Sequence, residues 1–153
     1  MRPSENATMK IHTAFVSELL VACAALSSGA PSLAQALPDF RCKVDAVISA
    51  PVLRAPEQKL LEQTYVGKEF TVARRTGHMA GVLKILSPVD PQVIDVGSAE
   101  NGFKMVATMR RSQGAGAGTS IYSLVVNTFD DAAGKPFLFT NNATAYVGTC
   151  AMF

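Results

Sequence analysis

The sequence predicts a mainly β domain, a small antiparallel sandwich or open barrel of about seven strands, with one short helix as an optional element. Two features indicate this class. Short runs rich in β-branched, aromatic or alternating apolar residues recur about every ten residues, and Gly, Pro, Asn and Asp separate them. Within residues 37–153, only one stretch has apolar residues at helical spacing.

The strand segments follow one another along the chain with short turns between them. The alternation of apolar and polar residues is clearest in 103–111. A turn at 75–78 is expected to join two neighbouring runs into a hairpin, and Asn141-Asn142 separates the last two runs. The segments with strand character are 40–48, 68–74, 79–86, 92–96, 103–111, 121–129, 137–140 and 145–150.

The one segment that favours a helix is 55–65. Pro56 suits the first helical position, Glu57 lies in the first turn, and Gly67 follows as a stop signal. The sequence by itself does not choose between a helix and an irregular loop here.

Composition limits the chain to one folded domain. It has 153 residues, of which 48% are hydrophobic and 17% charged, which excludes an intrinsically disordered chain and a polyelectrolyte. The net charge of +2 carries no information about partners. We expect one core, formed by Val44, Phe70, Val72, Val82, Ile85, Ile94, Phe103, Met105, Leu124, Val126, Phe137, Phe139 and Val147.

Residues 1–36 have the features of a secretory signal peptide. A basic start at Met9-Lys10 precedes an apolar run from Leu19 to Leu26 and an Ala-Gln-Ala site that ends at Ala36. The run is too short to cross a membrane, and Met9 is a candidate for the true start. We therefore expect a periplasmic or secreted domain of residues 37–153 without a transmembrane span. An apolar helix packed on the domain is the alternative for this segment.

A lipoprotein signal is a second interpretation of the same region. Leu20-Val21-Ala22-Cys23 fits the sequence that precedes a lipid-modified cysteine, and the small and polar residues after it would serve as a tether. Under this alternative the protein is anchored to a membrane at Cys23.

Two cysteines remain after the expected cleavage, Cys42 and Cys150. Two thiols in an oxidising compartment usually pair, so a disulfide bond between the two ends of the domain is predicted. A metal site or a reactive thiol pair has little support, because the chain has no Cys-x-x-Cys and His78 is the single histidine after residue 36.

Four short motifs resemble those of a group of small secreted proteobacterial proteins to which no activity is assigned. They lie at 67–72, 75–77, 97–101 and 148–150 and together extend over most of residues 37–153. The resemblance implies bacterial export, and it implies no catalytic residue.

Basic residues suggest one candidate binding site. Arg74, Arg75 and His78 are expected at a hairpin tip, and Arg110 and Arg111 end another strand. If these two ends are neighbours, the five side chains would form an anion-binding patch. Two ordinary solvated strand ends are the alternative.

No catalytic, cofactor-binding or metal-ligating residue is predicted. The glycine-rich segment 112–120 lacks the helix and the lysine of a phosphate-binding loop and is expected to connect two strands. None of the serines lies in a nucleophile motif, and the adjacent Asp130 and Asp131 fit a turn.

Three classes of function remain. The first is a non-catalytic binding domain for an anionic envelope component or another exported protein. The second is a periplasmic inhibitor of a hydrolase, which would present the 112–120 loop. The third is a small enzyme without a recognisable motif. Specific nucleic-acid binding is not expected, because the chain has no Trp and its aromatic residues fit core positions.

Overall fold

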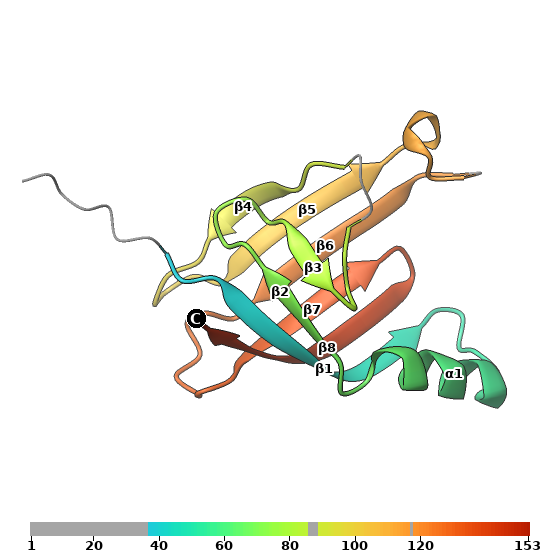
Figure 1. The fold of residues 1–153 in the computed structure, drawn as a ribbon, viewed down its shortest axis with the longest axis horizontal. Helices are drawn as coiled ribbons and strands as arrows, with labels where there is room; N and C mark the ends of the chain where they lie inside the picture. Colours follow the sequence, from blue (N-terminus) through green and yellow to red (C-terminus); the bar gives the residue numbers. More distant parts are fainter. Residues whose placement is uncertain (1–36, 86–88, 117) are drawn as a thin grey trace, which may run out of the picture. The chain divides into compact units, whose positions relative to one another are not determined.

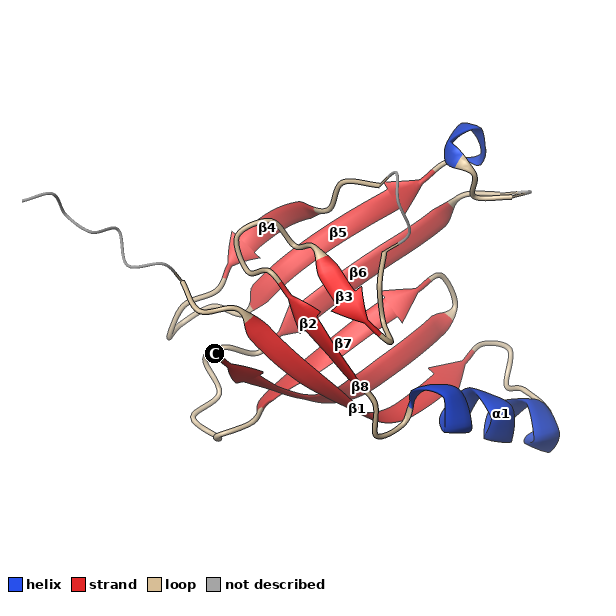
Figure 2. Cartoon of the chain, in the orientation of Figure 1, coloured by secondary structure: helices blue, strands red, loops and turns tan. Residues whose placement is uncertain are grey.

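The computed structural model describes residues 37–85, 89–116 and 118–153. These residues form one sheet of eight antiparallel strands that curls into a half-barrel (Figure 1). Figure 2 shows that strands dominate, with one α-helix and one short 3-10 helix. The mainly β class is thus confirmed. The expected signal peptide and the cysteine considered for lipidation lie outside the described residues.

Each segment with strand character contains a strand. The strands are β1 (Phe40–Ser49), β2 (Glu69–Val72), β3 (Met79–Gly81), β4 (Gln92–Val96), β5 (Phe103–Met109), β6 (Ser120–Val126), β7 (Lys135–Asn141) and β8 (Thr144–Met152). Their order across the sheet is β3-β2-β1-β8-β7-β6-β5-β4. The first strand therefore pairs with the last, which places the two chain ends of the domain side by side in the middle of the sheet.

The segment after β1 forms a helix and not an irregular loop. Helix α1 spans Ala55–Tyr65, with Pro in its first turn. The backbone N–H of Arg54 donates to the Glu57 carboxylate at 3.2 Å, and the two side chains form an ion pair. Gln58 fastens the helix to the end of β1, because its Nε2 donates to the Val47 carbonyl at 3.0 Å. The helix is thereby held beside the end of β1 (Figure 1).

The core lies on the concave face of the sheet. In β5 the alternation predicted from sequence is present, with Phe103, Met105, Ala107 and Met109 buried and the residues between them outside. Aromatic rings cross the interior: those of Phe40 and Phe103 are 5.3 Å apart between centroids, and those of Phe70 and Phe137 5.2 Å. Aromatic contacts at this spacing add to the free energy that burial contributes.

Two members of the expected core are misplaced. Ile94 is 65% exposed, because its neighbour Val93 pairs with Met105 and faces the interior, which turns Ile94 outward. In β8, Tyr146 and Cys150 are the buried residues. Because successive side chains alternate between the two faces of a strand, Val147 next to Tyr146 lies on the outer face. Val82 and Ile85 are only partly buried, whereas the other expected core residues are buried.

The hairpin of β2 and β3 lies in front of β5 and β6 in Figure 1, and its turn contacts β4 and β5. At its turn, Gly77 lies so close to Pro91, Val93 and Met105 that a β-carbon would be 3.0 to 3.3 Å from their side chains. Its φ of +74° is also one that residues with side chains rarely adopt. The hairpin therefore covers the open side of the half-barrel next to β4 and β5.

A β-bulge in β1 increases the curl of the sheet. The pairing with β8 shifts between Val44 and Ala46, and Gly148 of β8 lies directly against this irregularity. A β-carbon at Gly148 would be 2.0 Å from the Lys43 carbonyl oxygen and 2.8 Å from the Phe137 ring. The close approach of the two backbones requires glycine at this position.

We expect Gly148→Ala to lower the free energy of unfolding by at least about 1–3 kcal/mol, because the new methyl group forces β1 and β8 apart. Gly118→Ala is the matched control, since nothing lies within 4 Å of its β-carbon position. Urea denaturation of both variants measures the difference. Equal stability of the two variants would contradict the close packing at the bulge.

Candidate functional site

The predicted disulfide bond is present. Cys42 of β1 and Cys150 of β8 lie directly opposite each other and are bonded, and both are buried in the concave core. The bond joins residues that are 108 positions apart. The described residues contain no group of three or more His, Cys, Asp or Glu side chains that could hold a metal ion.

Arg74, the first residue of the expected anion patch, is a buried structural residue. Only 5% of it is exposed. Its Nε donates to the Val96 carbonyl at 2.5 Å and its Nη2 to the Gly97 carbonyl at 2.8 Å, while its guanidinium lies 5.2 Å from the centre of the Phe40 ring. Burial lowers the pKa of Arg74 from its ordinary value. Backbone carbonyls and an aromatic face thus surround this cation and link the β2–β3 turn to the end of β4.

The other two residues of that turn are exposed, as predicted. Arg75 and His78 are both on the surface, and the His78 backbone N–H donates to the Thr76 hydroxyl at 3.4 Å. The turn and its hairpin are therefore confirmed, but Arg74 does not share the surface with its neighbours.

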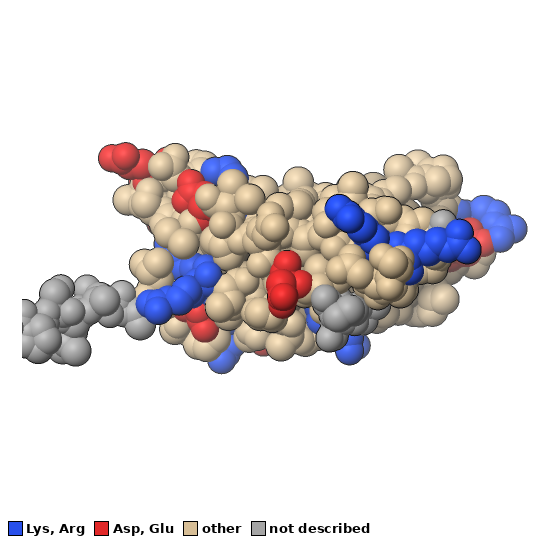
Figure 3. Space-filling view, turned by 90° about the horizontal axis from the view of Figure 1, so that it is seen from above, with Lys and Arg blue, Asp and Glu red and all other residues tan. Residues whose placement is uncertain are grey.

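The five basic residues do not form one exposed patch, because Arg74 is buried and its guanidinium lies at the opposite end of β5 from Arg110. Arg74 contacts Val96, which pairs with Phe103 at the beginning of β5, whereas Arg110 follows the last residue of the same strand. At about 3.4 Å per residue, β5 separates the two ends by about 20 Å, well beyond the distance over which charges interact at physiological salt. Figure 3 shows the Lys and Arg side chains of one face in separate groups toward the two ends of the domain.

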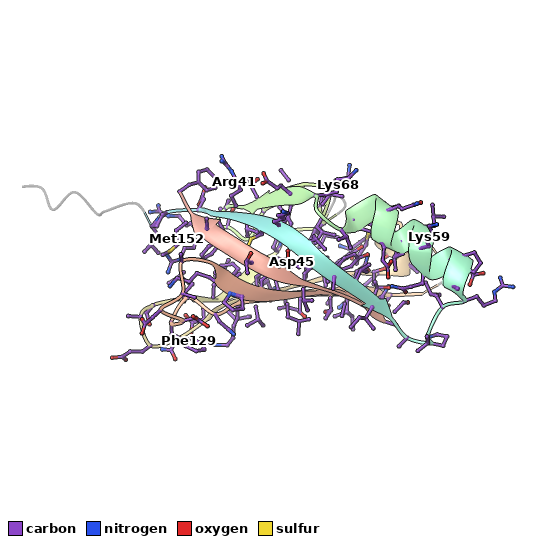
Figure 4. All side chains as sticks on the ribbon, turned by 90° about the horizontal axis from the view of Figure 1, so that it is seen from below. Arg41, Asp45, Lys59, Lys68, Phe129 and Met152 are labelled. Atoms are coloured by element: carbon purple, nitrogen blue, oxygen red, sulfur yellow. A yellow bond between two sulfur atoms is a disulfide. The ribbon has the colours of Figure 1, made fainter. Side chains whose placement is uncertain are left out.

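The sheet has two chemically different ends. Arg74 also contacts the Met152 sulfur at 3.8 Å, which assigns it to the end that holds the C-terminus. Figure 4 shows Met152 at that end and Lys59, on α1, at the other. The contacts of Arg74 lie at the C-terminal end of the sheet. The hollows and the pocket described next lie toward the α1 end.

Arg110 and Arg111 form an exposed surface of their own between β5 and β6. Two adjoining hollows of about 500 and 760 Å³ flank Arg110, and Thr108 and Ser112 line both of them. The ion pairs among the described residues are Arg54–Glu57 and Lys104–Asp95, so neither guanidinium has an acidic partner there. We call the polar part of this region the arginine surface, made of Asp90, Gln92, Thr108, Arg110, Arg111, Ser112, Gln113 and Thr119. The rest of the lining is apolar and consists of Val89, Val106, Ala107 and Ile121.

The glycine-rich segment connects two strands, as predicted. After β5 the chain makes the 3-10 helix η1 (Arg111–Gln113), and Gly114 and Gly116 have positive φ angles before β6 begins. The Gln113 side chain accepts a hydrogen bond from the Arg110 backbone N–H at 2.9 Å, and this bond stabilises the turn that carries both arginines. No helix follows that could present its N-terminus to a phosphate.

A second cavity lies on the concave face, and it collects every tyrosine of the chain. The sequence contains three tyrosines, and they come from α1, β6 and β8. The cavity measures about 200 Å³. We call it the tyrosine pocket, lined by Tyr65, Val82, Leu83, Lys84, Tyr122, Phe139, Asn141 and Tyr146.

The aromatic rings of the tyrosine pocket contact one another. Tyr65 meets Tyr146 edge-on at 4.9 Å between ring centroids, and the Phe139 ring lies 5.8 Å from Tyr146 and 6.4 Å from Tyr122. Tyr122 and Tyr146 are 3% and 4% exposed, whereas Lys84 is on the surface. Burial, together with the neighbouring Tyr65, raises the pKa of Tyr146 well above its ordinary value. Tyr146 therefore keeps its proton and remains a hydrogen-bond donor at any physiological pH.

Sequence reasoning missed this pocket, although one signal was available. The chain has three tyrosines and no Trp, and each tyrosine lies within a segment assigned to a helix or strand. Side-chain alternation alone cannot tell which of these residues share one end of a barrel, because that depends on strand order.

Comparisons with protein-family models, curated proteins and solved structures gave no match for this chain. The relation to secreted proteobacterial proteins thus stays a prediction from the motifs. Among the residues that the structure describes, no helix is both long enough and apolar enough to span a membrane.

Proposed function

We propose that this protein is an exported, non-catalytic binding domain and that its arginine surface holds an anionic ligand. One observation carries the proposal: two exposed guanidinium groups, adjacent in sequence and without an ion-pair partner among the described residues, line hollows that also contain neutral hydroxyl and amide side chains. Guanidinium forks match the oxygens of carboxylate, sulfate and phosphate groups, and neutral donors beside them add hydrogen bonds.

The shape of the surface favours an extended ligand over a small one. The hollows adjoin at Thr108, Arg110 and Ser112 and lie on the outer face of the sheet, where Thr108 pairs with the exposed Ile121. An acidic glycan or another repeating polyanion of the cell envelope could occupy both hollows at once. Among the described lining residues Asp90 is the one carboxylate, and it would repel the charged groups of such a ligand toward Arg110 and Arg111.

The disulfide bond supports the proposed location. Bonds of this kind form and persist in the periplasm and outside the cell, and are rare in the cytosol. A buried bond between β1 and β8 therefore agrees with export, which the motifs of residues 1–36 also predict.

We expect the double variant Arg110→Ser/Arg111→Ser to bind heparin, used as a model polyanion, at least about tenfold more weakly than the parent, because each charged hydrogen bond contributes about 1.5–3 kcal/mol. Binding of the parent should fall steeply as salt is added. Isothermal titration at two salt concentrations measures both effects.

A control variant distinguishes binding at the arginine surface from an effect of the protein's overall charge. Lys68→Ser/Arg75→Ser removes the same charge from two exposed residues outside the arginine surface. It should bind heparin nearly as well as the parent. If both double variants lose affinity equally, binding reflects overall charge and the proposed site is refuted.

A further inference from the structure

We propose that the tyrosine pocket is a second, independent binding site that takes a small carboxylic acid with an apolar ring. It lies on the opposite face of the sheet from the arginine surface. In β5 and β6, Ala107 pairs with Tyr122 on the buried face, and Thr108 pairs with the exposed Ile121 on the other. The two sites therefore share a strand pair but no side chain.

The fold brings the three tyrosines together from distant parts of the chain. Tyr122 pairs with Asn141 across β6 and β7, and Tyr146 pairs with Phe139 across β7 and β8, so the strand register places all four at the same end of the sheet. Helix α1 then adds Tyr65 against Tyr146. Every tyrosine of the chain thus lines one cavity, although a core could equally have been filled by Phe at these positions.

The polar groups of the lining are suited to donating hydrogen bonds to an acid. The three phenols, the Asn141 amide and the Lys84 ammonium can all donate, and no carboxylate is among the lining residues. A ligand oxygen with negative charge is the group that such a set of donors binds best.

The apolar part of the lining and the size of the cavity define the rest of the ligand. Val82, Leu83 and the Phe139 ring form an apolar wall. The cavity, at about 200 Å³, is smaller than the pockets of about 300–1,000 Å³ that hold drug-sized molecules. A single ring bearing one carboxylate fits this volume, with the ring against the wall and the carboxylate toward Lys84 at the surface.

The absence of Trp from the sequence allows a direct test. Intrinsic emission of the protein comes from its tyrosines, all of which line the pocket. Cyclohexanecarboxylate is a probe that does not absorb where tyrosine is excited. Its titration should change the tyrosine emission in a saturable manner, and the neutral cyclohexylmethanol and the cationic cyclohexylmethylamine should bind more weakly.

Substitution of Lys84 tests the role of charge without disturbing the core, because this side chain is exposed. Lys84→Met should weaken cyclohexanecarboxylate binding at least about tenfold and leave cyclohexylmethanol binding unchanged. Lys68→Met, an exposed lysine outside the pocket, is the control and should bind like the parent. Arg110→Ser/Arg111→Ser should also bind like the parent, so the outcome is independent of the polyanion site.

Three outcomes would overturn the proposal. The first is no saturable change in tyrosine emission with cyclohexanecarboxylate at millimolar concentrations. The second is tighter binding of cyclohexylmethylamine, which would make the pocket an aromatic site for cations. The third is an equal loss of affinity in Lys84→Met and Lys68→Met. That result would mean that Lys84 acts only through the net charge of the protein.

Discussion

Replacing both Cys42 and Cys150 by alanine is expected to lower the free energy of unfolding by about 2–5 kcal/mol. The bond closes a loop of 108 positions, so its loss restores much conformational freedom to the unfolded chain. Small domains are stable by only about 5–15 kcal/mol, so this change removes a large share of the total. Alanine is the preferred replacement because both positions are buried and a serine hydroxyl would lack a partner there.

Urea denaturation with and without reductant checks this prediction. The parent should lose stability when dithiothreitol is added, and the double-alanine variant should be insensitive to it. Thiol titration of the unfolded, non-reduced parent should detect no free thiol from Cys42 or Cys150. A parent whose stability is unchanged by full reduction would show that the bond contributes nothing.

Arg74→Ala is expected to lower the free energy of unfolding by about 2–4 kcal/mol, although arginine is usually a surface residue. The substitution removes the donors to the Val96 and Gly97 carbonyls and the cation from the face of Phe40. It leaves the two carbonyls without these partners and a void between the β2–β3 turn and β4. The loosened turn should no longer cover the open side of the half-barrel.

Arg75→Ala is the matched control, since it changes the same residue type at the next position. Arg75 is exposed, and its replacement should shift stability by less than about 0.5 kcal/mol. Thermal and urea unfolding compare the two variants, and hydrogen exchange of the β4 amides should increase only in Arg74→Ala. Equal stability of the two variants would mean that Arg74 is ordinary surface charge.

The local elements could be predicted from the sequence because their signals are local. Helix α1 spans the segment that favours a helix, and Pro56 and Glu57 mark its beginning through local backbone geometry and capping. These signals located the segment but did not by themselves decide between a helix and a loop. The alternation in β5 likewise follows from the strand geometry of neighbouring residues. The disulfide could be predicted because only two of the three cysteines, Cys42 and Cys150, follow the expected cleavage site.

The candidate sites could be predicted only in part. The turn that holds Arg75 and His78 and the exposed end of β5 were correctly located, but the sequence left open whether these two ends are neighbours. Neighbouring strand ends were needed for the five-residue patch, and a sequence pattern does not encode which strands are neighbours. Arg74 and Arg75 are also identical in type, so nothing local distinguishes the buried one from the exposed one.

The sequence by itself determined the β class and the approximate positions of the strands, because propensity and turn chemistry act within a few residues. It also predicted the crosslink between the two cysteines that follow residue 36. Only the tertiary structure decided the strand order and register, and with them the burial of Arg74, the isolation of the arginine surface and the meeting of Tyr65, Tyr122 and Tyr146. These features depend on contacts between residues far apart in the chain. The register shift in β1 opposite Gly148 is one such feature, because it depends on the close approach of β1 and β8.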